Sequence, residues 1–146
     1  MSELYQALIV EHDRSPKHEG PLPGATHEAT VDNPLCGDVV TMRLVVDGDV
    51  IREAAFEARG CALARAGASM LTTRAATATA DQLRALASTF EQFVRDAPGA
   101  PIPAELGDLA AFAGVRTFKS RRTCATLGFH ALLAALARPA APDKRH

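Results

Sequence analysis

The stretch VVTMRLVVDGDVIREAAFEARGC (39–61) contains an alternating apolar pattern, a turn signal, and a glycine followed by a cysteine. In its first half every second residue is large and apolar: Val40, Met42, Leu44 and Val46. This period of two is typical of a strand with one buried face, and it predicts a strand over 38–46. The pair Asp47-Gly48 is a strong hairpin signal because glycine tolerates positive φ, so a second strand is predicted over 50–59.

The second of these predicted strands is irregular, and a further strand precedes the pair. Its apolar residues change phase between Ile51 and Phe56, which indicates a β-bulge in that interval. Upstream, ATHEATVD (25–32) predicts another strand. From Gly60 onward, in GCALARAGASMLTTRAATA, the apolar period becomes helical. The chain therefore changes from extended to helical structure at this glycine.

Helices are expected before and after the three strands. Apolar spacing predicts helices over the following segments: 3–13, from Gly60, 81–96, 104–113 and 124–137. The last one, CATLGFHALLAALA, is almost entirely apolar, which predicts burial against the sheet, and Pro139 stops it. Phe90, Phe93 and Val94 are expected in the core. Strands followed by segregated helices favour an α+β fold, in which helices pack on one face of a three-stranded antiparallel sheet.

Length, charge and apolar content argue against several classes of protein. With 146 residues, 47% of them hydrophobic and 23% charged, the chain predicts one globular domain over 1–138 and a disordered tail over 139–146. The net charge of −1 argues against nucleic-acid binding by bulk charge. No apolar run is long enough for a transmembrane helix and the N-terminus lacks the pattern of a signal peptide, so a cytoplasmic protein with no membrane partner is expected.

Three cysteines, Cys36, Cys61 and Cys124, each fall at a predicted boundary between elements. An odd number cannot pair fully within one chain, and in a reducing cytosol spaced cysteines more often indicate metal binding or catalysis than a disulfide. Cys36 lies in the loop NPLCGD (33–38), two residues before Asp38. Cys61 and Cys124 are both expected at helix N-termini, where the helix dipole favours the thiolate and lowers the pKa of the thiol.

Three thiolates and one carboxylate form a set of four ligands. Four ligands suit a tetrahedral Zn²⁺, and the same groups could hold part of an iron–sulfur cluster. Such an anionic site needs nearby cations, which the run KSRR (119–122) can supply. Two simpler interpretations stay open, because a free cysteine is often only a small buried side chain and a basic run is often only a solvated face. The residues alone leave the function open.

Three strings surround the cysteines: DNPLCGD (32–38), RGCALARAGASML (59–71) and RRTCATLGFHAL (121–132). They resemble the three cysteine motifs of the U-type iron–sulfur assembly proteins, the family of IscU, SufU and the N-terminal part of NifU. The opening LYQALIVEHDRSPKHEG (4–20) is similar to the first helix and loop of that family. The resemblance covers about residues 3–137 and implies a SufE/IscU-like α+β fold.

Within that family the chain most resembles the SufU branch. IscU-like members carry a histidine directly before the third cysteine, where this chain has Thr123. They also carry an LPPVK motif upstream, where this chain has RTFKSRR (116–122). The 62 residues between the second and third cysteines exceed the spacing expected of the IscU branch, and the surplus is expected within 81–105.

A further residue connects the chain to this branch, and one segment departs from it. SufU-like proteins typically carry an arginine three residues before the last cysteine, and Arg121 occupies that place. They also carry a proline-containing run just upstream, where this chain has Lys119-Ser120 instead. The arginine therefore fits the SufU pattern, whereas the segment before it does not.

The resemblance implies a zinc-dependent sulfurtransferase of iron–sulfur cluster biogenesis. SufU-like proteins accept persulfide sulfur from a PLP-dependent cysteine desulfurase of the SufS type and pass it to the SufBCD assembly machinery. Carried over to this chain, the zinc ligands are Cys36, Asp38, Cys61 and Cys124. Cys36 would be the sulfur acceptor, and Arg121 would stabilise the thiolate or persulfide charge.

Two other functions stay open. In the first, the same cysteines and Asp38 hold a transient [2Fe–2S] cluster, so that the chain is an assembly scaffold. In the second, the chain is a noncatalytic interaction module that zinc stabilises, although structural zinc sites usually use cysteine and histidine alone. A Cys/His hydrolase is less favoured, because no histidine forms a recognisable motif with a cysteine. His12 and His18 are expected at the surface, and His130 as a partly buried histidine with a hydrogen-bond partner.

Overall fold

Three antiparallel strands form a sheet in the computed structural model, which describes residues 3–34 and 37–139. The strands are β1 (His27–Asn33), β2 (Asp38–Asp47) and β3 (Val50–Arg59), and they lie in the order β1-β2-β3. Each strand therefore neighbours the next one in sequence, as expected of a meander whose connections are short.

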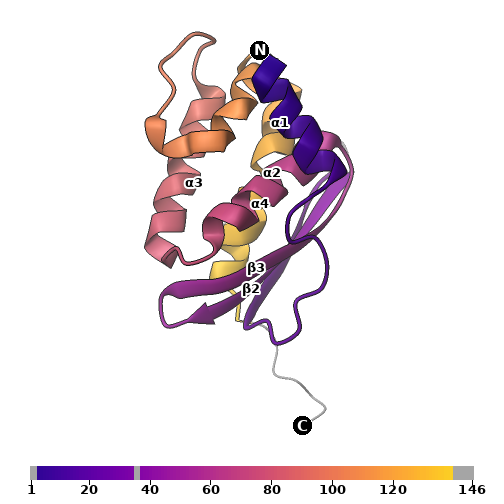
Figure 1. The fold of residues 1–146 in the computed structure, drawn as a ribbon, viewed down its shortest axis with the longest axis vertical. Coiled ribbons are helices and arrows are strands. Elements are labelled where there is room, and N and C mark those ends of the chain that lie inside the picture. The colour runs from indigo at the N-terminus through magenta and orange to yellow at the C-terminus, as the bar shows by residue number, and fades with distance from the viewer. Residues whose placement is uncertain (1–2, 35–36, 140–146) are drawn as a thin grey trace.

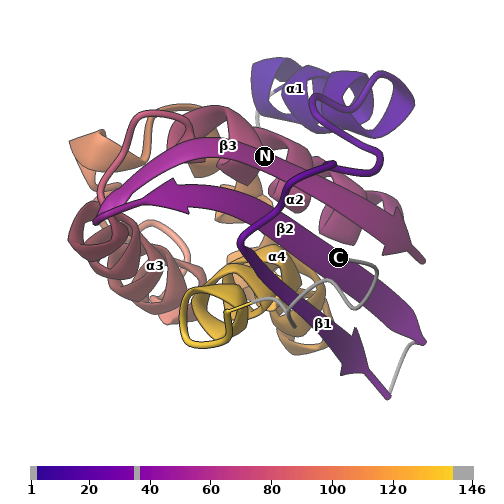
Figure 2. The same cartoon turned by 90° about the horizontal axis from the view of Figure 1, so that it is seen from below.

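Within the described residues, five helical segments accompany the sheet (Figure 1). They are α1 (Glu3–Arg14), α2 (Ala62–Ala75), α3 (Ala80–Arg95), the 3-10 segment η1 (Ala104–Thr117) and α4 (Lys119–Leu136). Helix α4 packs against β1 and β2, while α2 packs against β3, and Figure 2 shows both helices beneath the same face of the sheet. Helix α1 packs on α2 and η1, and α3 packs on η1 and α4. The predicted α+β fold with helices on one face is confirmed.

The hairpin between β2 and β3 fixes the register of the sheet. Asp47 pairs with Val50, and Gly48 has a φ of 65° in the turn between them. Further along, Val45 pairs with Glu53 whereas Val46 pairs with Ile51, so β3 has one extra residue at this point. The predicted β-bulge lies within the predicted interval, and it returns the following apolar residues of β3 to the buried face.

The two faces of the sheet differ in chemistry. Val40, Met42 and Leu44 are fully buried on the face that α2 and α4 cover. On the opposite face the Thr30 and Thr41 hydroxyls lie 2.8 Å apart, in a solvent-exposed pair. The alternation along β2 therefore separates a buried apolar face from a polar one, as the period of two requires.

Helix α4 begins five residues earlier than expected. The sequence predicted its start at Cys124, but the helix begins at Lys119, after the extended residue Phe118, whose φ is −128°. Lysine and arginine are good helix formers, so the basic run before the cysteine becomes the first turn of the helix. Cys124 consequently lies in the second turn, and the expectation that it occupies a helix N-terminus is wrong.

The segment between α3 and α4 is held together by one buried arginine. The Arg116 side chain is 3% exposed, and its guanidinium donates hydrogen bonds to the carbonyl oxygens of Phe93 (2.8 Å) and Ala100 (2.9 Å). It also lies 4.3 Å from the centre of the Phe93 ring. Arg116 therefore joins the end of α3 and the proline-rich loop after it to η1.

The predicted core of this region is confirmed. Phe90, Phe93 and Val94 are fully buried. The Phe90 ring lies 5.0 Å from the Phe129 ring and 5.7 Å from the Phe112 ring, measured between ring centres. Aromatic contacts thus connect α3 with both η1 and α4.

One residue of the predicted disordered tail, Pro139, pairs with the sheet. Pro139 forms an isolated bridge with His27 at the start of β1, and residues 140–146 of the predicted tail lie outside the described residues. Among the residues that the structure describes, no helix has the length and apolarity needed to cross a membrane.

Candidate metal centre

Three of the four predicted ligands meet at one end of the sheet. Asp38 is the first residue of β2, Cys61 is separated from the end of β3 by Gly60 alone, and Cys124 lies in the second turn of α4. One ligand atom from each of them, a carboxylate oxygen and two sulfurs, lies within 4.8 Å of the others. The register of the hairpin and the packing of α4 under β1 and β2 bring these residues together from distant positions in the sequence.

Both oxygens of the Asp38 carboxylate accept a hydrogen bond from Cys61. Its side chain is 1% exposed, and Oδ1 accepts a hydrogen bond from the backbone N–H of Cys61 at 2.9 Å. Its Oδ2 accepts a hydrogen bond from the Cys61 thiol at 3.2 Å. The carboxylate therefore satisfies the amide at the start of α2 and presents its second oxygen to a thiol.

Cys61 is the N-cap residue of α2, with φ −78° and ψ 162°. The pKa of its thiol is raised above 9.0, chiefly because burial disfavours the thiolate. The Ala64 N–H opposes this shift, whereas the Asp38 carboxylate adds to it, and Cys124 lowers the pKa by donating a hydrogen bond. The pKa of the Cys61 thiol is therefore raised and not lowered as the sequence suggested, because burial has a larger effect than the hydrogen bond from the Ala64 N–H.

Cys124 lies where α2 and α4 approach each other closely. Its side chain is 4% exposed, and its sulfur lies 3.9 Å from the Ser120 carbonyl oxygen. Nearby, a Cβ at Gly128 would lie 3.2 Å from the Ala68 Cα, and a Cβ at Gly67 would lie 3.1 Å from the Ala125 carbonyl oxygen. Small residues on both helices therefore permit the close approach that places Cys124 beside Cys61.

The chemistry of this donor set fits zinc. Thiolate sulfur and carboxylate oxygen are both zinc ligands, and neighbouring ligands of a tetrahedral zinc ion lie roughly 3–4 Å apart. The three donor atoms satisfy this spacing approximately, since all lie within 4.8 Å of one another. Burial of Asp38 and Cys124 would shield a bound ion from water.

Two further predicted site residues stand apart from this cluster. Cys36 lies outside the described residues; the ends of its loop, Asn33 and Asp38, pair with each other across β1 and β2. Arg121 lies in the first turn of α4 with an exposed side chain, and its backbone N–H donates to the Phe118 carbonyl oxygen at 2.9 Å.

The basic run contributes less to the cluster than its sequence suggested. The Arg122 guanidinium donates to the Arg116 carbonyl oxygen at 2.7 Å, so it connects α4 to the end of η1. Lys119 and Arg121 are exposed.

The histidines follow the sequence expectation in part. His130 lies 2.6 Å from Glu91 Oε1, which confirms a partly buried histidine with a hydrogen-bond partner. His18 is exposed, as expected. His12 is only partly exposed, and its Nδ1 lies 2.6 Å from the hydroxyl oxygen of the fully buried Ser69 on α2. His12 therefore belongs to the α1–α2 interface, which α1 periodicity alone did not indicate.

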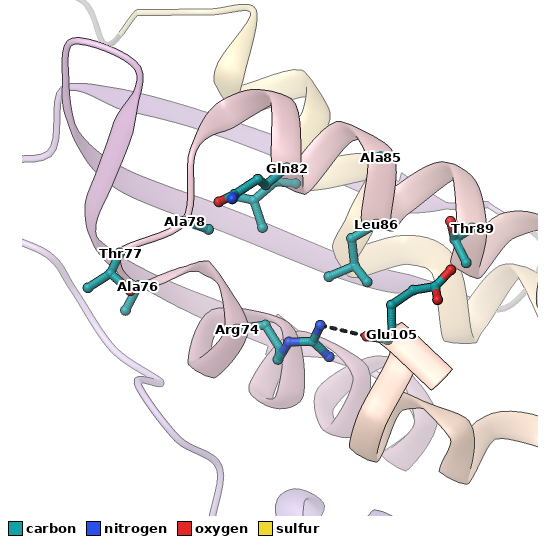
Figure 3. A pocket seen from close by; sticks show the side chains of 10 residues that line it. Arg74, Ala76, Thr77, Ala78, Gln82, Ala85, Leu86, Thr89 and Glu105 are labelled. Carbon is teal, nitrogen blue, oxygen red and sulfur yellow. Dashed lines mark hydrogen bonds between the residues drawn. The ribbon is translucent and has the colours of Figure 1, made fainter. Parts of the chain in front are cut away.

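A cavity of about 480 Å³ opens beyond the opposite end of α2 (Figure 3). The Arg74 guanidinium at its edge donates to the backbone carbonyl oxygen of Glu105 at 2.7 Å and to that of Leu106 at 2.8 Å. None of the three clustered ligand residues lines this cavity, and its lining contains no cysteine or histidine. This cavity is therefore separate from the candidate metal centre.

Comparison with known families and curated proteins places these observations in context. The family model of the NifU-like N-terminal domain matches residues 4–125. The iron-sulfur cluster assembly scaffold protein IscU of Streptococcus pyogenes serotype M1 is 34% identical over 140 residues, which are 96% of this chain and 87% of that protein. The zinc-dependent sulfurtransferase SufU of Bacillus subtilis is 30% identical over 132 residues, covering 90% of this chain and 88% of that protein.

Solved structures agree with the fold. The N-terminal part of a NifU-like protein from Brucella abortus has a TM-score of 0.82 at 30% identity, over 91% of this chain and 92% of that one. FiSufU from Fervidobacterium islandicum AW-1 also has a TM-score of 0.82, at 26% identity, over 93% of this chain and 96% of that one. The three-stranded sheet with its helices thus matches structures of both the NifU-like and the SufU type.

Proposed function

The chain belongs to the NifU-like N-terminal domain family, and from this premise we propose that it is a zinc-dependent sulfurtransferase of iron–sulfur cluster assembly. The observation that carries the proposal is the cluster of one carboxylate and two thiols within 4.8 Å, which fits a single zinc ion. Thr123 stands directly before Cys124, where IscU-like members carry a histidine, and this supports transfer over scaffolding. A relative with 30% identity bears the name zinc-dependent sulfurtransferase.

The proposed metal ligands are Asp38, Cys61 and Cys124, with Cys36 as the fourth. Bound zinc would keep the thiols of its ligands deprotonated at neutral pH. This matters for Cys61, because burial raises the pKa of its thiol in the metal-free chain. The Asp38 carboxylate keeps the start of α2 in place through the Cys61 amide.

Cys36 is the proposed sulfur acceptor. Cys124 is shielded within a helix at 4% exposure, and Cys61 is fixed by its position as the N-cap of α2 and by Asp38. In the transfer step the Cys36 thiolate attacks the terminal sulfur of a cysteine persulfide on the donor protein. A new S–S bond forms at Cys36, the donor's S–S bond breaks, and the donor cysteine leaves as a thiolate, so no external oxidant or reductant is needed.

The proposed donor is a PLP-dependent cysteine desulfurase of the SufS type, and the proposed recipient is a SufBCD-like assembly complex. The exposed Arg121 side chain, three residues before Cys124, would stabilise the negative charge of the thiolate or persulfide. A cytoplasmic location, where such an assembly operates, stays a prediction from the sequence.

Persulfide transfer to single-cysteine variants tests the assignment of roles. The zinc-loaded parent and the Cys36→Ala, Cys61→Ala and Cys124→Ala variants are incubated with a SufS-type desulfurase and cysteine, and the added sulfur is located by mass spectrometry. We expect sulfur on Cys36 of the parent and none on Cys36→Ala, while the other two variants lose zinc affinity. If Cys36→Ala retains zinc and accepts sulfur at the parent rate, the role given to Cys36 is wrong.

Assembly of a [2Fe–2S] cluster on the same residues is the second candidate. One observation favours it: the relative that is 34% identical bears the name of an assembly scaffold. Purification under argon after expression with added iron separates the candidates. A brown protein with iron and acid-labile sulfide held by Cys61 and Cys124 supports the scaffold, whereas a colourless zinc protein supports transfer.

A further inference from the structure

The residue before Cys61 has a backbone that only glycine adopts easily. Gly60 connects β3 to the N-cap of α2 with a φ of 128°. This value lies in the region where side chains with a Cβ are strained. In the register of the sheet Val39 pairs with Arg59, so the next step of the same ladder directs Gly60 towards Asp38.

Space at this position is taken by the Asp38 carboxylate. A Cβ built on Gly60 would lie 1.9 Å from Asp38 Oδ1 and 2.6 Å from its Cγ. It would also lie 2.9 Å from the Asp38 Cα, which is a backbone atom, so rotation of the Asp38 side chain alone could not remove every close contact. The carboxylate therefore occupies the volume that any other residue at position 60 would fill.

The same carboxylate makes the contacts that orient it towards the cysteines. Its Oδ1 accepts the Cys61 N–H at 2.9 Å, and its Oδ2 faces the Cys61 sulfur at 3.2 Å. Asp38 is 1% exposed, so it has no solvent-filled space into which it could retreat. A shift of Asp38 would break the amide hydrogen bond and move Oδ2 away from the Cys61 sulfur.

We propose that Gly60 is a positioning residue for the metal centre, because its missing side chain is what admits the Asp38 carboxylate as a ligand. This inference rests on the proposed zinc site but not on sulfur transfer. It assigns different tasks to the two carboxylate oxygens. Oδ1 is committed to the Cys61 amide, and Oδ2 is the oxygen offered to the metal.

A matched pair of glycine variants separates this role from backbone strain. Gly20 has a φ of 141°, comparable to that of Gly60, but a Cβ there would meet no atom within 4 Å. Gly20→Ala therefore introduces a similar backbone strain without a steric clash, whereas Gly60→Ala introduces both. Asp38→Ala and the double variant Asp38→Ala/Gly60→Ala complete a cycle in which the two closest contacts are removed.

The readouts are the zinc dissociation constant, by competition with a chromophoric chelator, and the visible absorption bands of the cobalt(II)-substituted protein. We expect Gly60→Ala to weaken zinc binding by about 10- to 100-fold, in the range found for groups that orient metal ligands. Asp38→Ala should weaken it to a similar extent, and the double variant should be no weaker than Asp38→Ala. Gly20→Ala should bind zinc like the parent.

The cobalt bands report the ligand set directly. Gly60→Ala and Asp38→Ala should change them in the same way, and Gly20→Ala should leave them as in the parent. If Gly60→Ala does not fold, the double variant should recover a cooperative thermal transition, because the two closest contacts are gone and only the 2.9 Å contact with the Cα of residue 38 is left for the backbone to relieve. The inference is overturned by parental zinc affinity in Gly60→Ala, by losses that multiply in the double variant, or by a double variant that stays unfolded.

These outcomes are distinct from failure of the proposed function. If the parent chain binds no zinc, the proposed metal site itself is wrong. If the parent chain and Gly60→Ala bind zinc with the same affinity, only the role proposed for Gly60 is wrong.

Discussion

The Asp38 carboxylate has a structural task as well as a proposed metal-binding task. It accepts the Cys61 amide hydrogen bond at the start of α2, a position where helices leave amide groups without intrahelical partners. It also raises the pKa of the Cys61 thiol, in addition to the larger effect of burial. The residue thus connects a strand, a helix terminus and a thiol through one side chain.

Neutralising this carboxylate is predicted to lower the pKa of the Cys61 thiol in the zinc-free chain. In Asp38→Asn the negative charge is lost while an amide oxygen can still accept the Cys61 N–H. We expect the pKa of the Cys61 thiol to fall relative to the parent, because Asp38 is one of the groups that raise it, after the larger effect of burial. The pH dependence of thiol alkylation, measured with Cys36→Ser in both proteins, reports this pKa. An unchanged or higher pKa would contradict the assigned causes.

His12 is predicted to make stability depend on pH. Burial lowers the pKa of its ring below 6.5; Glu11 and Asp108 oppose the shift, and Lys17 adds to it. The unfolded chain therefore takes up a proton at a higher pH than the folded chain does. The contribution of the neutral ring to stability is present above pH 6.5 and is lost as the pH falls through the lowered pKa.

Comparison of His12→Asn with the parent measures this effect. Urea unfolding at a series of pH values from about 7.5 to about 5 gives the free energy of unfolding of each protein. The parent should be the more stable at neutral pH, because its ring bonds with the buried Ser69 hydroxyl. The difference between the two proteins should shrink on acidification, and a difference independent of pH would contradict the prediction.

At the scale of elements, the proline-rich loop after α3 depends on Arg116. Replacing Arg116 with methionine keeps much of the buried volume but leaves the carbonyl oxygens of Phe93 and Ala100 without their donor. We expect a loss of roughly 2–4 kcal/mol in the free energy of unfolding, since buried groups lose charged hydrogen bonds. Arg84 is the matched control: it is exposed on α3 and pairs only with Asp81 among the described residues.

Arg84→Met should lower the free energy of unfolding by about 0.5 kcal/mol or less, as is usual when an exposed ion pair is lost. Urea denaturation of the two variants and the parent provides the comparison. Equal losses in the two variants would show that Arg116 does not hold the loop.

The elements differ in how well the sequence alone could predict them. The strands and the bulge were predictable because the period of two, and its break between Ile51 and Phe56, are local patterns. The start of α4 was not, because residues 119–123 carry no apolar periodicity and gain their helical structure from good helix formers. The contacts of Arg116 could not be predicted either, because its partners in α3 and the following loop are brought to it by tertiary packing.

The candidate metal centre was also predictable from the sequence only in part. The positions of the cysteines at predicted element boundaries, the adjacent carboxylate and the family resemblance selected Asp38, Cys61 and Cys124, which the structure brings together. The direction of the Cys61 pKa shift was not predictable, because it depends on burial, which a sequence does not contain. The steric relation between Gly60 and Asp38 also appears only once the strand register is known.

At the scale of the whole molecule, the candidate metal centre and the cavity of Figure 3 lie at opposite ends of α2. The centre lies at the N-terminal end of α2, beside Cys61, and the cavity lies beyond its C-terminal end, at Ala76 and Thr77. Helices α2 and α4 cover the apolar face of the sheet, as Figure 2 shows, and the centre lies where α2 begins, with Cys61 partly buried and Cys124 and Asp38 buried.

The central claim is that this chain is a zinc protein that takes sulfur from a desulfurase. The most direct measurement is the turnover of a SufS-type cysteine desulfurase with and without the purified chain, together with the metal content of that same preparation. The account predicts a colourless protein with about one zinc per chain and a faster turnover that is lost when the zinc is removed. Iron with acid-labile sulfide in place of zinc, and a desulfurase turnover that the chain leaves unchanged, would contradict it.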